Sequence, residues 1–329
     1  MNAPIPNAAL QPVMAADLAA LSLIEKWISF ASVSRDSNLP LIDWTKALLE
    51  AQGVHCEVIY DETGKKANMW ATIPAANGET KIGGIVLSGH TDVVPVDGQP
   101  WNTDPFVAQV IGDKLYGRGV TDMKGFSATA LMMVPELVKR TLKQPVHFAF
   151  SYDEEIGCIG VRTMIAWMVD QGYKPAGCIV GEPTGMQVVI AHKGKHGYKT
   201  SVRGFEAHSS LTPQGVNAVE IACRFVANLR TMHERLAKEG PFDPVFDVPH
   251  TTIHTGVIAG GTALNIIPRD CEIAWEIRHP HLNSPVTLFN EAKAFADAMI
   301  PAMQAVAPDT GITHKQTSVL PGFSTDADS

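Results

Sequence analysis

The chain has 329 residues, of which 45% are hydrophobic and 18% charged, and its formal net charge is -8 at pH 7. This composition is typical of a globular protein, and the length favours two domains over one. The negative charge argues against a nucleic-acid partner, and no apolar run is long enough for a bilayer span, so we expect no membrane partner. The segment Met1–Gln11 has no charge before an apolar core, so we expect a frayed tail and not a signal peptide.

Five cysteines are scattered along the chain, and no C-x-x-C motif occurs. They are Cys56, Cys158, Cys178, Cys223 and Cys271. An odd number of widely spaced cysteines is typical of reduced thiols, so we predict a cytoplasmic protein. We interpret each cysteine as a small core residue and not as a metal ligand or nucleophile.

The first part of the chain alternates between helical and strand patterns. Apolar spacing predicts helices over 17–30, 41–52, 123 into the 130s, and 160–170. Strands are predicted over 54–60, 67–73, 83–90, 146–152 and 178–180. This alternation indicates an α/β domain with a mostly parallel sheet and helices on both faces, which we place at residues 1–192.

The pattern changes in the second part of the chain. Strand patterns over 197–204, 251–258, 269–278 and 312–318 are interleaved with helical patterns over 216–237 and 286–299. The order strand, helix, strand, strand, helix, strand is that of a ferredoxin-like βαββαβ unit. We therefore predict an inserted domain at residues 193–318, with residues 319–329 returning to an incomplete first domain.

The predicted apolar strand over 83–90 ends in a histidine, and an aspartate follows two residues later. In extended backbone, residues i and i+2 point to the same side, so His90 and Asp92 can lie together at the carboxyl end of the strand. Open α/β sheets carry their sites at this edge. An imidazole that binds a metal through one nitrogen needs an acceptor at the other, and Asp92 supplies one. Taken alone, the pair fits a strand end followed by a turn equally well.

Other acidic residues follow turns and strands elsewhere in the first domain. Asp122 lies between a glycine-rich turn and a helix start, where by itself it is better explained as an N-cap. Glu154 and Glu155 are adjacent carboxylates just after a strand, and a bound cation would relieve their repulsion. Glu182 precedes a proline at another strand end. With His90, this set predicts two divalent metal ions, Zn or Co, that share a water molecule.

The stretches that contain these residues resemble the successive motifs of the M20 co-catalytic metallopeptidases. They are Ser88–Val94, Gly117–Gly125, Asp153–Gly157 and Gly181–Thr184. Within that family, four further stretches are similar to the acetylornithine deacetylases: Ala191–Tyr198, Glu206–Ser210, Gly215–Ala218 and Gly260–Pro268. The resemblance runs from about residue 20 to the end of the chain.

The resemblance implies a metal-binding role for four residues. His90 would bind one metal ion, with Asp92 orienting its ring. Asp122 would bridge the two ions. Glu182 would complete the first site, and Glu155 would bind the second ion.

The resemblance also implies the catalytic and substrate-binding residues. Glu154 would be the general base. The inserted unit would be a lid that forms a homodimer, and His208 would reach across from the partner's lid to stabilise the oxyanion. Asn265 and Arg278 would bind the substrate's carboxylate. From the residues alone, His208 beside two serines fits a turn residue, and Arg278 fits a strand-end arginine in water.

The implied activity is hydrolysis of N2-acetyl-L-ornithine to acetate and L-ornithine, a step of arginine biosynthesis. The substrate would be a small N-acyl amino acid. Other N-acyl amino acids, N-succinyl-diaminopimelate and dipeptides remain open as alternatives. A nucleotide enzyme is excluded, because Gly117-Arg118-Gly119 does not continue as G-x-G-x-x-G and no P-loop motif occurs.

One feature of the sequence departs from the family. The family supplies a last metal-ligand histidine from a C-terminal stretch with a Gly-Pro-Gly turn and an Ala-His pair, and this sequence ends at Ser329 without it. We therefore expect a C-terminally truncated product whose second metal lacks one ligand and whose sheet exposes apolar surface. A non-catalytic remnant that dimerises and binds metal weakly is the alternative.

Overall fold

A computed structural model describes residues 15–325, so the expectation for Met1–Gln11 lies outside the described residues. The chain divides into two compact units between Met186 and Gln187, slightly before the predicted boundary at 192/193. The stretch expected to return to the first domain is grouped with the second unit instead. The reason is that β13 (Phe323–Ser324) pairs with β8 (Ala191–His192).

The first unit contains most of the elements that the sequence predicts. Its helices are α1 (Ala15–Ile28), α2 (Leu39–Glu50), α3 (Gly125–Met132), α4 (Val134–Leu137) and α5 (Val161–Asp170), with a π-helical turn η1 (Val120–Lys124) before α3. Its main strands are β1 (His55–Tyr60), β2 (Ala67–Ile73), β3 (Ile85–His90), β6 (Val146–Ser151) and β7 (Gly177–Val180). A small hairpin of β4 (Gln109–Ile111) and β5 (Lys114–Tyr116) was not predicted.

The five main strands form one sheet in the order β1-β2-β6-β3-β7. Strands β6, β3 and β7 are parallel neighbours, whereas β2 is antiparallel to both β1 and β6. The sheet is therefore mixed, with β2 reversed among strands that otherwise run in one direction. The short connection from β1 to β2 explains the reversal, because a parallel crossover needs a dozen or more residues.

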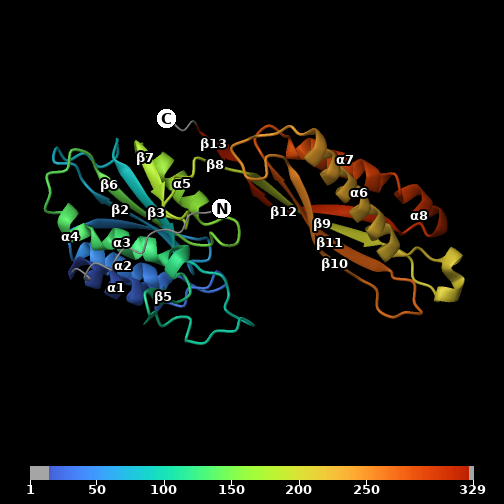
Figure 1. The fold of residues 1–329 in the computed structure, drawn as a ribbon, viewed down its shortest axis with the longest axis horizontal. Helices are drawn as coiled ribbons and strands as arrows, with labels where there is room; N and C mark the ends of the chain where they lie inside the picture. Colours follow the sequence, from blue (N-terminus) through green and yellow to red (C-terminus); the bar gives the residue numbers. More distant parts are fainter. Residues whose placement is uncertain (1–14, 326–329) are drawn as a thin grey trace. The chain divides into compact units, whose positions relative to one another are not determined.

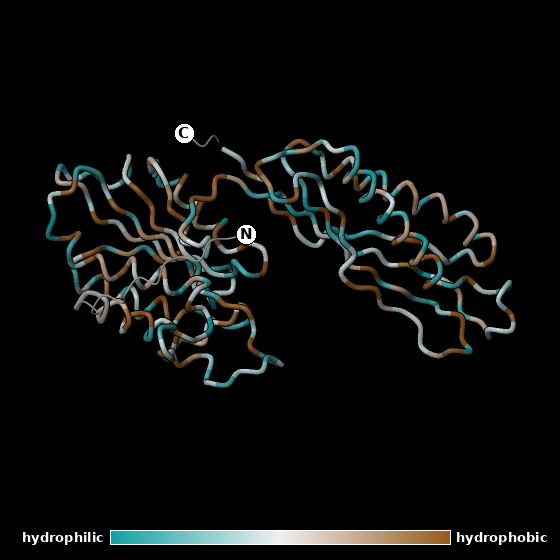
Figure 2. The backbone as a smooth tube through the Cα atoms, viewed as in Figure 1, coloured by the Kyte–Doolittle hydropathy of each residue, from teal (hydrophilic) through white to brown (hydrophobic). Residues whose placement is uncertain are grey.

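Helices cover both faces of this sheet, as predicted (Figure 1). Side chains on one face pack against α1 to α4, and Trp27, Met69 and Phe148 are fully buried there. On the other face Trp70 packs with Met164 of α5. Met69 and Trp70 are adjacent in β2 and point to opposite faces, as the two-residue period of a strand requires. Figure 2 shows apolar segments along these strands.

The second unit has the element order that the sequence predicts, with its second helix divided in two. Its elements are β8, β9 (Gly194–Arg203), a 3-10 turn η2 (Ser209–Gln214), α6 (Ala218–Glu239), β10 (Thr252–Gly260), β11 (Asp270–His279), α7 (Pro285–Asp297), α8 (Ile300–Val306), β12 (Gly311–Leu320) and β13. The helix predicted over 286–299 ends at Asp297, and Pro301 stands in the first turn of α8, where proline is tolerated.

The main sheet of the second unit is antiparallel, in the order β10-β11-β9-β12. Along β11 the buried side chains alternate with exposed ones, and Ile273, Trp275 and Ile277 face the core formed with α6 and α7. The other face carries charge, including an ion pair of 2.6 Å between Lys199 and Glu272. One face of the sheet is thus packed and the other is polar, which antiparallel sheets permit.

The interpretation of every cysteine as a core residue is wrong in part. All five are free; Cys56 and Cys271 are buried, but Cys178 and Cys223 are exposed and Cys158 is half-buried. Cys178 is exposed because it lies in β7, the edge strand of the first sheet, together with the exposed side chains of Ile179 and Val180.

None of the helices within residues 15–325 combines the length and the apolar character that a bilayer span requires.

Candidate metal centre

The carboxyl ends of three parallel strands bring the predicted residues together. His90 is the last residue of β3, Glu154 and Glu155 follow the end of β6, and Glu182 follows the end of β7. Because β6, β3 and β7 are parallel neighbours, these three positions meet at one edge of the sheet. Asp122 joins them from η1. The predicted convergence is therefore present in the structure.

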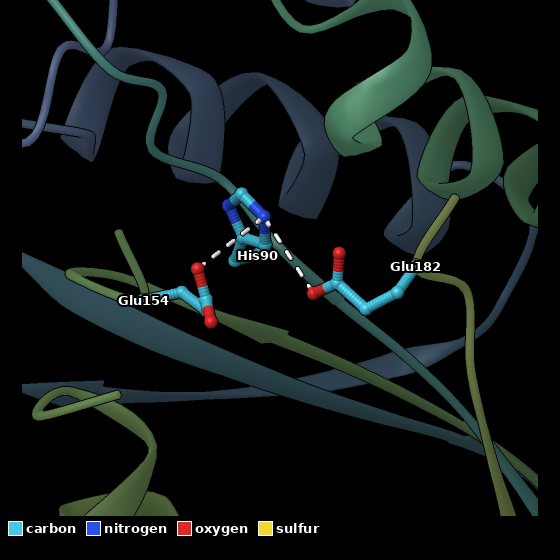
Figure 3. Close-up of side chains that lie close together, drawn as sticks. All are labelled: His90, Glu154 and Glu182. Atoms are coloured by element: carbon cyan, nitrogen blue, oxygen red, sulfur yellow. Dashed lines mark ion pairs between the residues drawn. The ribbon is translucent and has the colours of Figure 1, made fainter. Parts of the chain in front are cut away.

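The ring of His90 is held so that one nitrogen faces acidic groups. Its side chain is only 1% exposed, and its Nδ1 lies 2.9 Å from the backbone carbonyl oxygen of Asp92. A carbonyl oxygen can only accept, so Nδ1 carries the proton. In the neutral ring Nε2 then presents a lone pair, 3.0 Å from Asp122 Oδ1. The same nitrogen lies 3.8 Å from both Glu154 Oε2 and Glu182 Oε1 (Figure 3). A lone pair that faces carboxylates calls for a proton or a cation between them.

Asp92 connects this histidine to the loop that follows β6. The Asp92 carboxylate oxygen Oδ1 lies 3.5 Å from His90 Nδ1. The backbone carbonyl oxygen of Asp92, at 2.9 Å, is therefore the nearer acceptor for the Nδ1–H group of His90. The same carboxylate accepts hydrogen bonds from Ser34 Oγ at 2.7 Å and from the backbone N–H groups of Glu154 at 3.0 Å and Glu155 at 3.3 Å. Burial raises the pKa of Asp92, but the interactions with His90, Ser34 and the Glu154 N–H outweigh it and hold the pKa below its usual range. Asp92 therefore stays ionised and ties β3 to the Glu154–Glu155 backbone.

The N-cap interpretation of Asp122 is wrong. The N-cap position of η1 is Gly119 and that of α3 is Lys124, and no side-chain cap bond is made at either helix start. The Asp122 carboxylate instead faces His90. Close approach of α3 to β3 supports this arrangement: a Cβ on Gly89 would lie 2.3 Å from Ser127 Oγ, so only glycine fits beside His90.

Three polar residues near the site were not identified from the sequence. They are Ser34, Lys66 and Cys158. Lys66 Nζ lies 2.5 Å from Asp153 Oδ1 and 2.5 Å from the carbonyl of Ser34, and the Cys158 thiol donates to Glu154 Oε1 at 3.2 Å. Ser34 and Lys66 come from segments without a recognisable motif, and Cys158 directly follows the Asp153–Gly157 motif but is not part of it.

The crowding of carboxylates shifts the protonation of the centre. Burial raises the pKa of Glu182 to about 7; nearby His90 lowers it, while Asp122, Glu154 and Glu155 raise it further. Burial and Asp122 likewise raise the pKa of Glu155. Burial disfavours charge on His90, but Asp92, Glu154 and Glu182 outweigh it and raise its pKa to about 9. The site therefore favours added positive charge.

The donor set fits divalent metal ions. Two groups each bring one ligand atom per residue within 4.8 Å of the others: His90, Glu154 and Glu182, and His90, Asp122 and Glu155. One imidazole nitrogen with several carboxylate oxygens suits Zn, Co and related divalent ions. His90 belongs to both groups but offers a single Nε2, so the division of ligands between two ions stays a prediction.

The remaining predicted residues lie in the second unit. His208 is exposed at the start of η2, where its Nδ1 accepts from the backbone N–H of Ser210 at 3.2 Å. Asn265 is exposed in the connection between β10 and β11, and its carbonyl accepts from Ser209 N at 3.0 Å. The His208 and Asn265 segments are therefore neighbours.

Arg278 lies away from this pair. It is exposed near the carboxyl end of β11, and its Nε donates to Glu276 Oε1 at 2.8 Å. Asn265 lies in the segment before Asp270, at the other end of β11, where its neighbour Ile266 bridges His208. A strand rises about 3.3 Å per residue, so β11 spans roughly 26 Å between Asp270 and Arg278. Within one chain, Asn265 and Arg278 do not converge on one carboxylate.

Solved structures show the same fold. An M20 family metallo-carboxypeptidase from Sulfolobus solfataricus has a TM-score of 0.70 and 18% identity, covering 94% of this chain and 80% of that one. The YXEP protein of Bacillus subtilis, described as a dinuclear metal binding peptidase from the M20 family, has a TM-score of 0.55 and 15% identity, covering 94% and 77%.

Curated relatives are more similar in sequence. Acetylornithine deacetylase from Proteus mirabilis is 36% identical over 243 residues, which cover 74% of this chain and 60% of that protein. The protein of that name from Pasteurella multocida is 36% identical over 256 residues, which cover 78% and 64%. The chain thus spans less than two thirds of the length of these relatives. The sequence pattern of peptidase family M20/M25/M40 matches residues 86–328. With this match over most of its length, and with the motif residues gathered at one sheet edge, the chain belongs to peptidase family M20/M25/M40.

Proposed function

We propose that this protein is a metal-dependent amide hydrolase with a pair of divalent ions, Zn or Co, that deacetylates N2-acetyl-L-ornithine. The observation that carries the hydrolase proposal is the convergence of His90 Nε2 with carboxylate oxygens of Asp122, Glu154 and Glu182, which lie within 3.0 to 3.8 Å of it. The curated relatives named acetylornithine deacetylase support the choice of an acetyl group as the acyl group removed and of ornithine as the amino acid. A role in arginine biosynthesis in the cytoplasm follows from that substrate and from the free cysteines, and both stay predictions.

The proposed ligands are His90, Asp122, Glu155 and Glu182, with Asp92 orienting the histidine. When bound, the ions would polarise the amide carbonyl and lower the pKa of the attacking water.

Glu154 is suited to the acid–base role. Its side chain is 34% exposed, and its Oε2 faces the ligand cluster. A carboxylate in this position can take the proton of the attacking water and then donate it to the leaving α-amine, acting first as base and then as acid.

His208 is suited to bind the developing oxyanion. Its Nδ1 accepts from a backbone N–H group, so in the neutral ring the proton resides on Nε2. The exposed Nε2–H is then a donor for the substrate oxygen.

We further propose that the second unit is a ferredoxin-like lid through which the protein forms a homodimer. Two observations support this. Asn265 precedes the first residue of β11 and Arg278 is near its last, so two chains would be needed to bring both to one substrate carboxylate. Strand β10 is at the edge of its sheet and exposes Val257 and Ile258, and such an edge can pair with a second copy.

The decisive experiment is metal reconstitution of the purified chain. The protein is stripped with a chelator, reloaded with Zn²⁺ or Co²⁺, and analysed for bound metal by mass spectrometry and for release of ornithine from N2-acetyl-L-ornithine. We expect about two ions per chain and strictly metal-dependent release. N-succinyl-diaminopimelate, other N-acyl amino acids and a dipeptide are assayed in parallel. Faster turnover of one of these reassigns the substrate, and metal binding without any turnover contradicts the hydrolase proposal.

A further inference from the structure

The turn between β6 and α5 places a thiol against the proposed base. Cys158 Sγ lies 3.2 Å from Glu154 Oε1, within hydrogen-bonding distance for sulfur. The other oxygen, Oε2, is the one that lies 3.8 Å from His90 Nε2. The two oxygens of Glu154 are therefore distinguished: one contacts the thiol and the other faces the metal centre.

The backbone of this turn holds the thiol in place. Cys158 has φ of 53°, in the left-handed region that residues other than glycine seldom adopt. Its N–H donates to the carbonyl of Glu154 at 2.8 Å, and the N–H of Ile159 donates to the carbonyl of Asp153 at 3.1 Å. Glycine usually fills such a position, so a cysteine here is typical of a site where the side chain has a use.

The backbone of Glu154 is also held by a hydrogen bond. Its backbone N–H donates to Asp92 Oδ1 at 3.0 Å. With the main chain bound to Asp92 and one carboxylate oxygen bound to the thiol, the remaining freedom of the side chain is small. The free oxygen is then held toward the ligand cluster.

We propose that Cys158 is a positioning residue for the general base: its S–H donates to Glu154 Oε1 and directs Oε2 toward the metal centre. This role rests on the proposed function, because it matters for turnover only if Glu154 is the base. The side chain is a donor and not a nucleophile, and no covalent step is involved. An S–H group is a weak donor, so it orients the carboxylate without taking over its proton chemistry.

The first test compares variants that remove or keep the donor. Cys158→Ala is expected to lower kcat about tenfold while KM for N2-acetyl-L-ornithine changes by less than about twofold, because orientation and not substrate binding is lost. Cys158→Ser keeps a donor and is expected to retain at least about half of kcat. Cys178→Ala and Cys223→Ala, at exposed thiols, are the matched controls with unchanged kinetics. A normal kcat in Cys158→Ala, or a serine variant as impaired as the alanine variant, overturns the proposal.

The second test does not depend on activity. The metal-free chain is treated with iodoacetamide, and the alkylation rate of each cysteine is followed by peptide mass spectrometry, with Cys178 and Cys223 as internal references. A carboxylate beside a thiol suppresses the reactive thiolate, so Glu154→Gln is expected to speed alkylation of Cys158 several-fold. Glu62→Gln, at an exposed residue elsewhere in the unit, is the control.

The two tests separate the proposals. If the metal-loaded wild-type chain hydrolyses no amide, the proposed function fails, and the alkylation rates still decide whether the thiol engages Glu154. If the wild-type chain is active but Glu154→Gln leaves the alkylation of Cys158 unchanged, the positioning role fails while the hydrolase stands.

Discussion

Single residues at this site are defined by what their polar atoms face. His90 is buried with one nitrogen satisfied by a carbonyl and the other turned toward carboxylates. Glu154 differs from the rest of the cluster because one of its oxygens faces a thiol. We therefore expect the carboxylates of the cluster to differ in their roles, with Glu154 as the one that moves protons.

We predict that Glu154→Gln separates metal binding from turnover. The amide cannot accept the proton of water, so kcat should fall about 10²- to 10⁴-fold, whereas His90, Asp122, Glu155 and Glu182 remain to bind metal. Metal content by mass spectrometry and steady-state kinetics measure the two effects, with Glu62→Gln as the control. Near-normal kcat in the variant contradicts the base role.

A buried histidine outside the site should make the fold sensitive to acid. His147 is fully buried in β6, its Nδ1 lies 3.0 Å from Thr72 Oγ1, and its ring packs against Trp70 and Tyr173. Burial lowers the pKa of His147 below its usual 6.5. Below that pH the unfolded chain binds a proton that the folded chain does not, so stability is lost as pH falls from 6.5 toward the lowered pKa.

We therefore predict that His147→Phe reduces this sensitivity. The free energy of unfolding should drop less between about pH 7 and about pH 5 in the variant than in the wild type, whatever its value at neutral pH. Urea unfolding at both values, followed by tryptophan fluorescence, measures the difference. An equal drop in the free energy of unfolding in both proteins contradicts the attribution of the acid sensitivity to His147.

At the scale of elements, the turn after β6 is the part of the fold that shapes the site. It begins at Asp153, whose φ of 53° turns the chain so that Glu154 and Glu155 present their N–H groups to Asp92. Lys66, from the loop before β2, pairs with Asp153 and also bonds the carbonyl of Ser34. This ion pair is largely buried, with side-chain exposures of 16% and 8%.

Breaking this pair should destabilise the first unit strongly. Lys66→Met leaves the Asp153 carboxylate buried without its partner, and removing one member of a buried pair typically costs about 3–5 kcal/mol. Adding Asp153→Asn to Lys66→Met should recover a large part of that loss, because no uncompensated charge remains. Chemical unfolding of the single and double variants forms the test, and a double variant no better than Lys66→Met contradicts the buried-charge explanation.

At the scale of the whole molecule, the ligand cluster belongs entirely to the first unit. Binding to the folded state alone raises stability by mass action, so added metal should stabilise that unit and leave the second unit unchanged. Five of the six tryptophans lie in the first unit, and the sixth is Trp275. A Trp275→Phe variant therefore limits the fluorescence signal to the unit that contains the site.

We predict that Zn²⁺ or Co²⁺ at about 100 times its Kd stabilises this unit by about 2.7 kcal/mol. The shift should disappear on chelation and in a His90→Ala variant. Thermal unfolding of the Trp275→Phe protein with and without metal provides the measurement. An unfolding temperature that does not change when metal is added contradicts a preformed metal site.

The sequence alone predicted the order of the main elements and the side chains that gather at one edge of the first sheet. Hydrophobic periodicity and turn residues act over a few positions, so helices such as α2 and strands such as β2 were predicted within about two residues. The motif residues His90, Glu154 and Glu182 stand at or within three residues of strand ends, and the parallel pairing of those strands brings them to one edge.

Only the tertiary structure decided the rest, because it depends on contacts between distant segments. Ser34 meets Asp92 across 58 positions and Lys66 meets Asp153 across 87, and no local pattern encodes such pairs. The turn of Asp122 toward His90 and the exposure of Cys178 likewise follow from which neighbours the fold supplies. Local propensity selects elements, whereas the partner of each side chain is selected by packing of the whole chain.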